Sequence, residues 1–187
     1  MQGLMSPYPL TLPLLFHRAE RLFGEKTITT LTATGQDRTT YPDWAARTRR
    51  LAGALDTLGI SADGRVATFA WNSARHLELY FAAPCSGRVL HTLNIRLFPE
   101  QLSYIVDHAE DEVIFADRSL MKLLEPHLSE FSSVRHIVVM DDGCDDAVPD
   151  DGRIVDYEEL IDGAGEAEFA DGDESAAAAM CYTSGTT

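Results

Sequence analysis

Residues 65–117 read RVATFAWNSARHLELYFAAPCSGRVLHTLNIRLFPEQLSYIVDHAEDEVIFAD and carry the signals that decide the fold. Short apolar runs alternate with longer segments whose apolar residues recur at helical spacing. Gly87 is placed to end the first helical segment, and Pro99 to open the second. The stretch therefore predicts strand, helix, strand, helix and strand over 65–70, 73–85, 89–93, 99–109 and 112–116.

The alternation continues beyond this stretch, with a helix predicted over 119–128 and a strand over 135–140. Neighbouring parallel strands need a long return connection, which a helix supplies. The repeated strand–helix units therefore predict an α/β fold with a mostly parallel sheet flanked by helices. In such sheets ligands bind beyond the carboxyl ends of the strands.

Two helices and a hairpin are predicted on the N-terminal side. Thr-rich extended segments flank a turn signal at 34–37, and Gly59 is placed to end the second helix. Arg47, Arg49 and Arg50 fall off the apolar face of that helix and are predicted to point away from it. The elements are expected over 14–23, 27–32, 38–41 and 42–58.

Acidic charge is concentrated in one segment. Residues 141–174 hold 15 acids and a single base, Arg153, whereas the whole chain has 30 acids, 15 Lys and Arg, and a net charge of −15. Such a run favours a solvated connector over a metal or partner site. Residues 157–161 are a candidate for a short helix. We therefore divide the chain into an N-terminal α/β subdomain (1–140), an acidic connector (141–174), and a final apolar strand with a loop (175–187).

Composition excludes several classes of protein. A hydrophobic content of 45% and a charged content of 24% are typical of folded chains, and the negative charge argues against nucleic-acid binding. No apolar run approaches the roughly 18 residues of a membrane span. The N-terminus lacks the basic region of a secretory signal, and the three cysteines are isolated. We therefore expect a reduced, cytoplasmic protein.

The six histidines show no metal-ligand spacing, and no side chain is predicted to be catalytic. His76 is expected at the surface or in an interface, His91 as a hydrogen-bonded core or interface residue, and His108 near a helix end. Trp71 and Asn72 follow a strand end, where they are interpreted as a packing and capping pair.

The chain ends in a chemically distinctive pattern. The apolar run 176–182 leads directly into Thr183-Ser184-Gly185-Thr186-Thr187. Gly permits close approach of the backbone to a ligand, successive N–H groups can point at an anion, and Ser and Thr hydroxyls add donors or bind Mg²⁺. The pattern is typical of a phosphate-binding loop, although no Walker sequence is present and a frayed terminus has the same composition.

The string CYTSGTT resembles the start of the phosphate-binding loop of adenylate-forming enzymes. This superfamily comprises acyl-CoA synthetases, luciferases and peptide-synthetase adenylation domains. Upstream, DGRVATFAWN, RHLELYFA, VLHTLN and HAED are similar to the long- and medium-chain fatty-acyl-CoA synthetases. The resemblance extends from the helix at Leu14 to Thr187, and we identify the chain as an N-terminal portion of such an enzyme that stops inside the loop.

The resemblance implies a ligase that uses ATP, Mg²⁺ and coenzyme A. A fatty acid and ATP would give an acyl-adenylate and pyrophosphate, and coenzyme A would then displace AMP. Thr183 is expected to bind Mg²⁺, with Ser184, Gly185, Thr186 and Thr187 around the phosphates. The apolar residues Tyr8, Pro9, Leu10 and Leu12 are interpreted either as a segment that lies on its own domain or, from the resemblance, as an arm that helps to form a homodimer. Peripheral membrane contact stays open.

The sequence also departs from the family pattern. The Gly-x-Pro-Lys-Gly half of the loop, the acidic Mg²⁺ ligand, the acyl tunnel and the C-terminal domain are absent, so the isolated chain is expected to be inactive. Ile95 stands where relatives often have Pro, and Arg88 where they often have a small apolar residue. A non-catalytic folding or dimerisation module, or an enzyme that adenylates an aryl or amino acid, remains the alternative.

Overall fold

The computed structural model describes residues 3–4 and 8–183. Along the chain the elements are α1 (Leu12–Leu22), β1 (Thr27–Thr32), β2 (Gly35–Thr40), α2 (Tyr41–Thr57), β3 (Arg65–Phe69), α3 (Ala74–Cys85), β4 (Val89–Thr92), α4 (Pro99–Ala109), β5 (Asp111–Asp117), η1 (Arg118–Leu120), α5 (Met121–Leu124), η2 (Glu125–His127), β6 (His136–Met140), β7 (Ile154–Asp156), α6 (Tyr157–Asp162) and β8 (Ala179–Met180).

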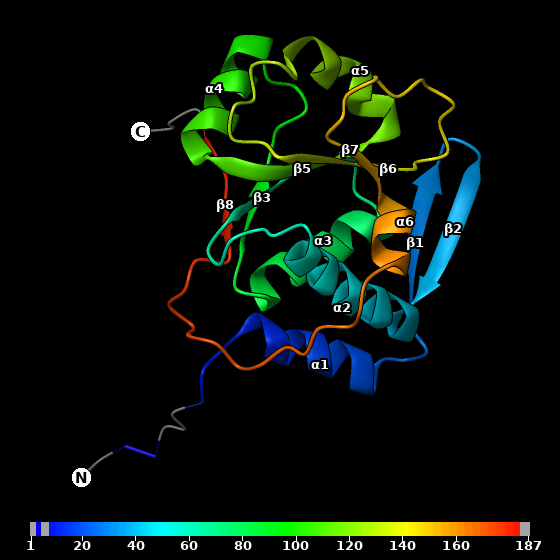
Figure 1. The fold of residues 1–187 in the computed structure, drawn as a ribbon. Helices are drawn as coiled ribbons and strands as arrows, with labels where there is room; N and C mark the ends of the chain where they lie inside the picture. The colour runs from blue at the N-terminus through cyan, green and yellow to red at the C-terminus, as the bar shows by residue number, and fades with distance from the viewer. Residues whose placement is uncertain (1–2, 5–7, 184–187) are drawn as a thin grey trace.

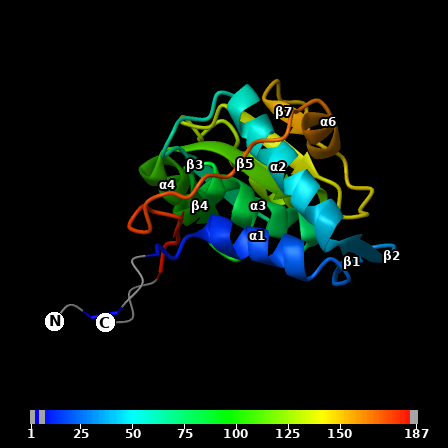
Figure 2. The same ribbon diagram turned by 90° about the horizontal axis from the view of Figure 1, so that it is seen from below.

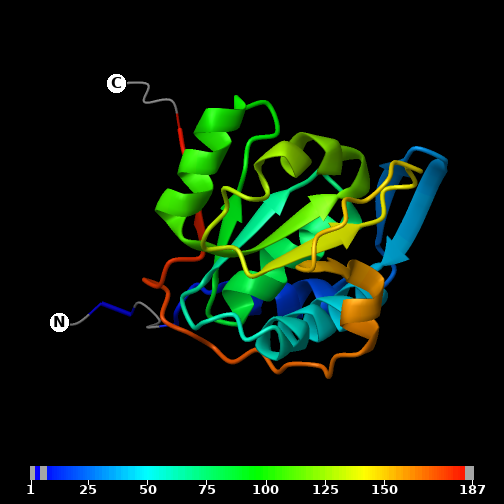
Figure 3. The same ribbon diagram turned by 45° about the horizontal axis from the view of Figure 1, so that its top comes forward.

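A six-stranded sheet in the order β7-β6-β5-β3-β4-β8 forms the centre of the molecule (Figure 1). All five of its pairings are parallel. The strands between 65 and 140 are the ones that the alternating pattern predicts, and the predicted α/β class is confirmed. The hairpin β1–β2 forms a separate antiparallel ladder beside the sheet (Figure 3).

Helices cover both faces of the sheet (Figure 1), and the view from below looks onto the face that α1, α2 and α3 cover (Figure 2). One core lies between the sheet and α1, α2, α3 and α6, and the other lies on the side of α4 and α5. Neighbouring β5 residues illustrate the division: Phe115 packs into the first core and Ile114 into the second, and both are fully buried. A strand buried on both faces reads as a continuous apolar run, which is why these strands are visible in the sequence.

Caps and turns set the ends of the helices. The Ser73 hydroxyl accepts a hydrogen bond from the His76 N–H at 3.1 Å and starts α3. Gly87, with φ +77°, turns the chain from α3 toward β4. This conformation favours glycine, as the sequence pattern indicated.

The acidic segment is more structured than its charge suggested. Within 141–174, β7 extends the sheet next to β6, and α6 follows it with Tyr157 and Ile161 fully buried. The expectation of a solvated connector is therefore wrong for β7, which was not predicted, whereas the short helix expected over 157–161 is confirmed by α6. The Asp156 carboxylate caps α6 by accepting hydrogen bonds from the Glu158 and Glu159 N–H groups. The domain boundaries themselves stay predictions.

Two predicted elements are shorter than expected. The helix expected over 119–128 is divided into η1, α5 and η2, because Pro126 lacks the N–H that a continuous helix needs. The strand expected over 176–182 is reduced to Ala179 and Met180, which pair with Leu90 and His91 of β4. Among the described residues, no helix is long and apolar enough to cross a membrane.

His76 also corrects an expectation. It is buried on α3, not at the surface, and its ring nitrogens lie 3.0 Å from the Trp71 carbonyl oxygen and 3.0 Å from the Thr68 hydroxyl. Burial lowers the pKa of this imidazole, although the bond to Trp71 opposes the change. The role is structural, because both ring nitrogens are used to join β3 to α3.

Candidate functional site

The predicted loop begins at the carboxyl edge of the sheet. Residues 181–183 leave β8, the edge strand beside β4, and Thr183 is exposed there. Ser184, Gly185, Thr186 and Thr187 lie outside the described residues. Of the five predicted phosphate-binding residues, Thr183 alone therefore has a described position, at the edge where parallel sheets bind ligands.

Tyr182, immediately before Thr183, lies against two histidines. Its hydroxyl and Nδ1 of His108 on α4 lie 2.5 Å apart. Its ring centroid lies 5.3 Å from that of His91 and 5.8 Å from that of His108. Partial burial raises the pKa of the Tyr182 hydroxyl, and the negative charge of Asp111 adds to this effect.

Behind Tyr182 lies a buried pair of hydrogen-bonded side chains. Nδ1 of His91 is 2.9 Å from both carboxylate oxygens of Asp111, and both side chains are fully buried. Burial raises the pKa of the Asp111 carboxyl, while His91 opposes the rise. The expectation that His91 is a hydrogen-bonded core residue agrees with this arrangement.

A separate cleft of about 280 Å³ lies between the β1–β2 hairpin and the ends of β3, β5 and β6. Asp117 on its wall is 2% exposed and accepts a hydrogen bond from the Trp71 N–H. Burial raises the pKa of Asp117 to about 6, although the Trp71 N–H opposes the rise. The residue that caps α3 is Ser73 and not Asn72. Trp71 is about half exposed, and its indole N–H donates a hydrogen bond to the Ser119 hydroxyl at 3.1 Å.

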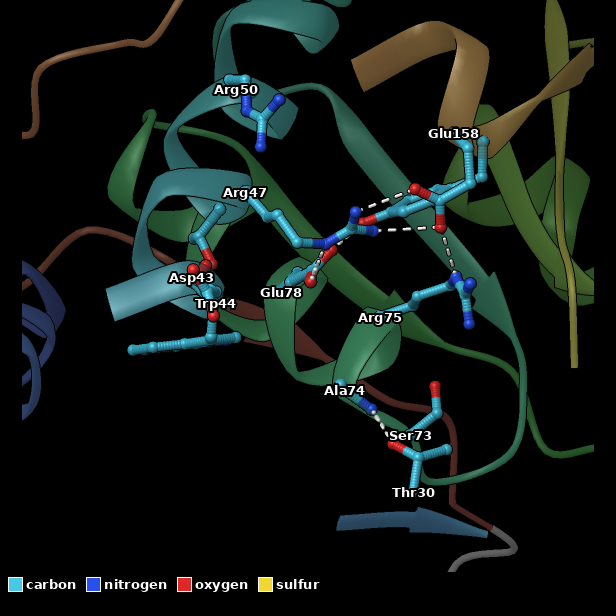
Figure 4. A network of polar contacts seen from close by, with 12 residues as sticks. Thr30, Asp43, Trp44, Arg47, Arg50, Ser73, Ala74, Arg75, Glu78 and Glu158 are labelled. Atoms are coloured by element: carbon cyan, nitrogen blue, oxygen red, sulfur yellow. Dashed lines mark hydrogen bonds and ion pairs between the residues drawn. The ribbon is translucent and has the colours of Figure 1, made fainter. Parts of the chain in front are cut away.

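A third polar cluster joins three helices (Figure 4). Arg47 of α2 donates to Glu78 of α3 at 2.7 Å and to Glu158 of α6 at 2.8 and 3.1 Å, and Arg75 also donates to Glu158. The buried Tyr157 hydroxyl donates to Glu78. Burial alone would lower the pKa of Arg47, but its bonds to Glu158 and Glu78 outweigh this and raise it.

Arg47 and Arg49 were predicted to point away from the packed face of α2, but both contact neighbouring helices. Arg47 is 22% exposed, and Arg49 pairs with Glu20 of α1 at 2.7 and 2.8 Å. The reason is that α2 is covered by α1, α3 and α6 together. Because every charge in the Arg47 cluster has a partner, we interpret the cluster as structural and not as a site.

No group of three or more His, Cys, Asp or Glu side chains in the described part of the chain is arranged to hold a metal ion. A Mg²⁺ ion bound with polyphosphate needs few protein ligands, because phosphate and water oxygens supply the others. The exposed hydroxyl of Thr183 is an oxygen ligand of the type that this ion takes. It therefore fits the role predicted for it, as one ligand among several.

Comparison with known proteins decides the family. Residues 16–187 match the family described as AMP-binding enzyme. A 3-methylmercaptopropionyl-CoA ligase from Ruegeria lacuscaerulensis is 40% identical over all of this chain. The chain belongs to the AMP-binding enzyme family. It spans about 35% of that relative's length.

Two further known proteins are similar to the chain. A long-chain-fatty-acid–CoA ligase from Thermus thermophilus is 43% identical over 91% of the chain, which covers 30% of that relative. The structure of an anthranilate CoA ligase in complex with anthranoyl-AMP superposes on the chain with a TM-score of 0.82 and 21% sequence identity. The superposition covers all of this chain and 35% of the anthranilate CoA ligase. The structure supports the fold, and the closer sequences bear out the resemblance inferred from CYTSGTT and the segments upstream.

Sequence reasoning missed the surroundings of Tyr182. The motif drew attention to the hydroxyl and glycine residues after it, and gave the tyrosine no role. A signal was present in the sequence, since His91, His108 and Asp111 lie in the segments VLHT and HAED that carry the resemblance. Their convergence on Tyr182 becomes visible only when β8 is placed beside β4.

Proposed function

We propose that this chain is part of an ATP-dependent acid–CoA ligase whose acid is a fatty acid. The acid's carboxylate would attack the α-phosphorus of ATP, which forms an acyl-adenylate and releases pyrophosphate. The thiolate of coenzyme A would then attack the acyl carbonyl, which forms the thioester and releases AMP. The observation that supports the proposal is the position of Thr183: it lies three residues beyond the end of β8, at the carboxyl edge of the sheet, in a chain 43% identical to a long-chain-fatty-acid–CoA ligase.

The chain's own contribution to the reaction is the beginning of a phosphate cradle. The Thr183 hydroxyl would bind Mg²⁺, and the N–H and hydroxyl groups from Ser184 to Thr187 would surround the β- and γ-phosphates. When bound, Mg²⁺ would neutralise the charge that develops on the departing pyrophosphate. Donors fixed in advance at this position lower the barrier without reorganising during the reaction.

The name of one relative favours a second candidate for the acid substrate. The relative from Ruegeria, at 40% identity, is named for a short thioether acid and not for a fatty acid. We therefore propose 3-methylmercaptopropionate as the alternative substrate, and an aryl acid as a third. Because the relatives are named for different acids, a direct comparison of acids is needed.

The test uses a full-length protein that contains this sequence. Pyrophosphate release is measured with ATP, Mg²⁺ and one acid at a time: octanoate, palmitate, 3-methylmercaptopropionate, benzoate, or none. We expect the highest kcat/KM with a fatty acid, and thioester formation after coenzyme A is added. The fatty-acid proposal fails if 3-methylmercaptopropionate or benzoate is preferred. The ligase proposal fails if no acid accelerates the release, a result that would favour a non-catalytic module.

A further inference from the structure

The backbone of β8 gives little support to the loop that follows it. Its ladder with β4 has two register pairs, Leu90 with Ala179 and His91 with Met180. The Leu90 N–H donates to the Ala178 carbonyl at 3.1 Å. Thr183 therefore lies three residues beyond the end of the ladder. A binding loop needs its donors held in place beforehand, so the attachment must come from side chains.

Tyr182 supplies this attachment on its outer side. The hydroxyl is hydrogen-bonded to His108 at 2.5 Å, and the His108 ring stacks on Tyr104 one turn earlier in α4, with centroids 5.3 Å apart. This places the Tyr182 phenol against α4 while its backbone continues from β8. The contact spans 74 residues of sequence and ties the loop to the face of the sheet that α4 covers.

The inner side of Tyr182 is supported by His91 and Asp111. A carboxylate only accepts hydrogen bonds, so Nδ1 of His91 donates to Asp111. Nε2 of His91 is buried and has no hydrogen-bond partner among the described residues. The Tyr182 ring packs against this imidazole, with the two ring centroids 5.3 Å apart and the ring planes tilted by 45°. Because Asp111 fixes the orientation of the imidazole, the surface against which the Tyr182 ring packs is fixed as well.

We propose that Asp111, His91 and His108 are positioning residues that fix the Tyr182 ring, and through it the Thr183 backbone, for binding the polyphosphate of ATP. The inference rests on the proposed ligase function. Asp111 orients the imidazole, the imidazole supports one side of the ring, and His108 fixes the hydroxyl. None of the three touches the nucleotide. Their effect is to restrict the first residue of the loop.

The first arm of the test needs no activity and uses the 187-residue chain. The ¹⁵N order parameter of the Thr183 amide is measured in the wild type, in Tyr182→Leu and in Tyr182→Phe. We expect a value near the rigid range of about 0.85 in the wild type and below about 0.6 in Tyr182→Leu. Tyr182→Phe keeps the ring on His91, so its order parameter should lie between the values of the wild type and Tyr182→Leu. Tyr80→Leu is the matched control. The Tyr80 ring also packs on a histidine, with its centroid 4.9 Å from that of His76, but it lies elsewhere on the surface.

The second arm uses the full-length protein and acid-dependent ATP–pyrophosphate exchange. Tyr182→Leu should raise the KM for Mg·ATP at least ten-fold, with kcat and the KM for coenzyme A changed less than three-fold and the unfolding midpoint retained. Asp111→Asn should raise the same KM about three-fold, because Asn keeps the shape but loses the charge that orients His91. Tyr182→Phe should restore most of the affinity.

Either of two results overturns the proposal: a Thr183 amide that is equally ordered in the wild type and in Tyr182→Leu, or an equal rise of the KM values for ATP and coenzyme A. A wild type without acid-dependent exchange would refute the ligase function, and the order parameters would still report whether Tyr182 holds Thr183.

Discussion

The carboxylate of Asp117, at the end of β5, accepts a hydrogen bond of 2.6 Å from the backbone N–H of Trp71, which directly follows β3 and Ala70. The bond fixes the turn between β3 and α3 at the carboxyl edge of the sheet. It also requires a carboxyl group that is almost completely buried, with Asp142 as a second acid nearby.

Asp117 should make the protein less stable as the pH rises. Its pKa is raised from 3.8 to about 6, so between these values the folded protein holds a proton that the unfolded chain releases. Stability from this group is complete below about pH 4 and is lost as the pH passes 6. Asp117→Asn does not titrate. In urea unfolding, the stability of the wild type relative to this variant should fall by about 2–3 kcal/mol between pH 4 and pH 7. If the difference in stability between the wild type and Asp117→Asn did not change with pH, the raised pKa of Asp117 would be contradicted.

Gly53 tests the contact between α2 and the segment after α6. A Cβ on Gly53 would lie 2.0 Å from the Gly165 carbonyl oxygen, and the Ala167 N–H donates to the Arg49 carbonyl one turn earlier. Gly53→Ala should therefore lower the free energy of unfolding by about 1–3 kcal/mol, although alanine favours helices.

Gly165→Ala is the matched control for this contact, because a Cβ there meets nothing within 4 Å. Its unfolding free energy should stay within about 0.5 kcal/mol of the wild type. Equal stability of the two variants would show that the segment does not pack on α2.

Arg153 should hold the first part of the acidic segment against the domain. Its guanidinium donates to the carbonyl of Leu128 at 2.7 Å, to those of Phe131 and Val134 at 3.3 Å, and to Asp151. Its hydrogen bonds lower the pKa of Asp151 to about 2. Arg153→Gln should leave these carbonyls without their partner, and limited proteolysis within 141–153 should become several-fold faster.

Lys122→Gln is the control for Arg153, because it removes an exposed ion pair to Asp146 in the same segment. Exposed pairs of this kind contribute little, so cleavage should be almost unchanged. Residues 154–162 should resist cleavage in all three proteins, since β7 and α6 are part of the packed domain. Early cleavage within 154–162 would argue against this packing.

The sequence predicts the parts of the fold whose burial is visible in a short window. Strands such as β5 are apolar on both faces, and Ser73 and Gly87 mark the ends of α3. The three residues of β7 are missed because only Ile154 and Val155 are apolar, within an acidic segment. Arg47 is misjudged because a helical projection shows one packed face, whereas neighbours from distant parts of the chain cover the other sides of α2.

The same limit applies to the candidate site. The sequence can single out Thr183 as a candidate, because a run of small hydroxyl and glycine residues after an apolar strand is a local pattern. The support of Tyr182 by His91 and His108 is not, because it depends on the register of β8 against β4 and on the position of α4. Those are long-range pairings that no short window of sequence contains.

The central claim, that Thr183 begins the phosphate site of an acid–CoA ligase, is tested most directly by acid-dependent ATP–pyrophosphate exchange in the full-length protein. If the hydroxyl stabilises the departing pyrophosphate through Mg²⁺, Thr183→Ala should reduce the exchange by about 2–4 kcal/mol of transition-state stabilisation, or roughly 30- to 1000-fold, with the fold retained. Exchange at the wild-type rate in Thr183→Ala would contradict the account.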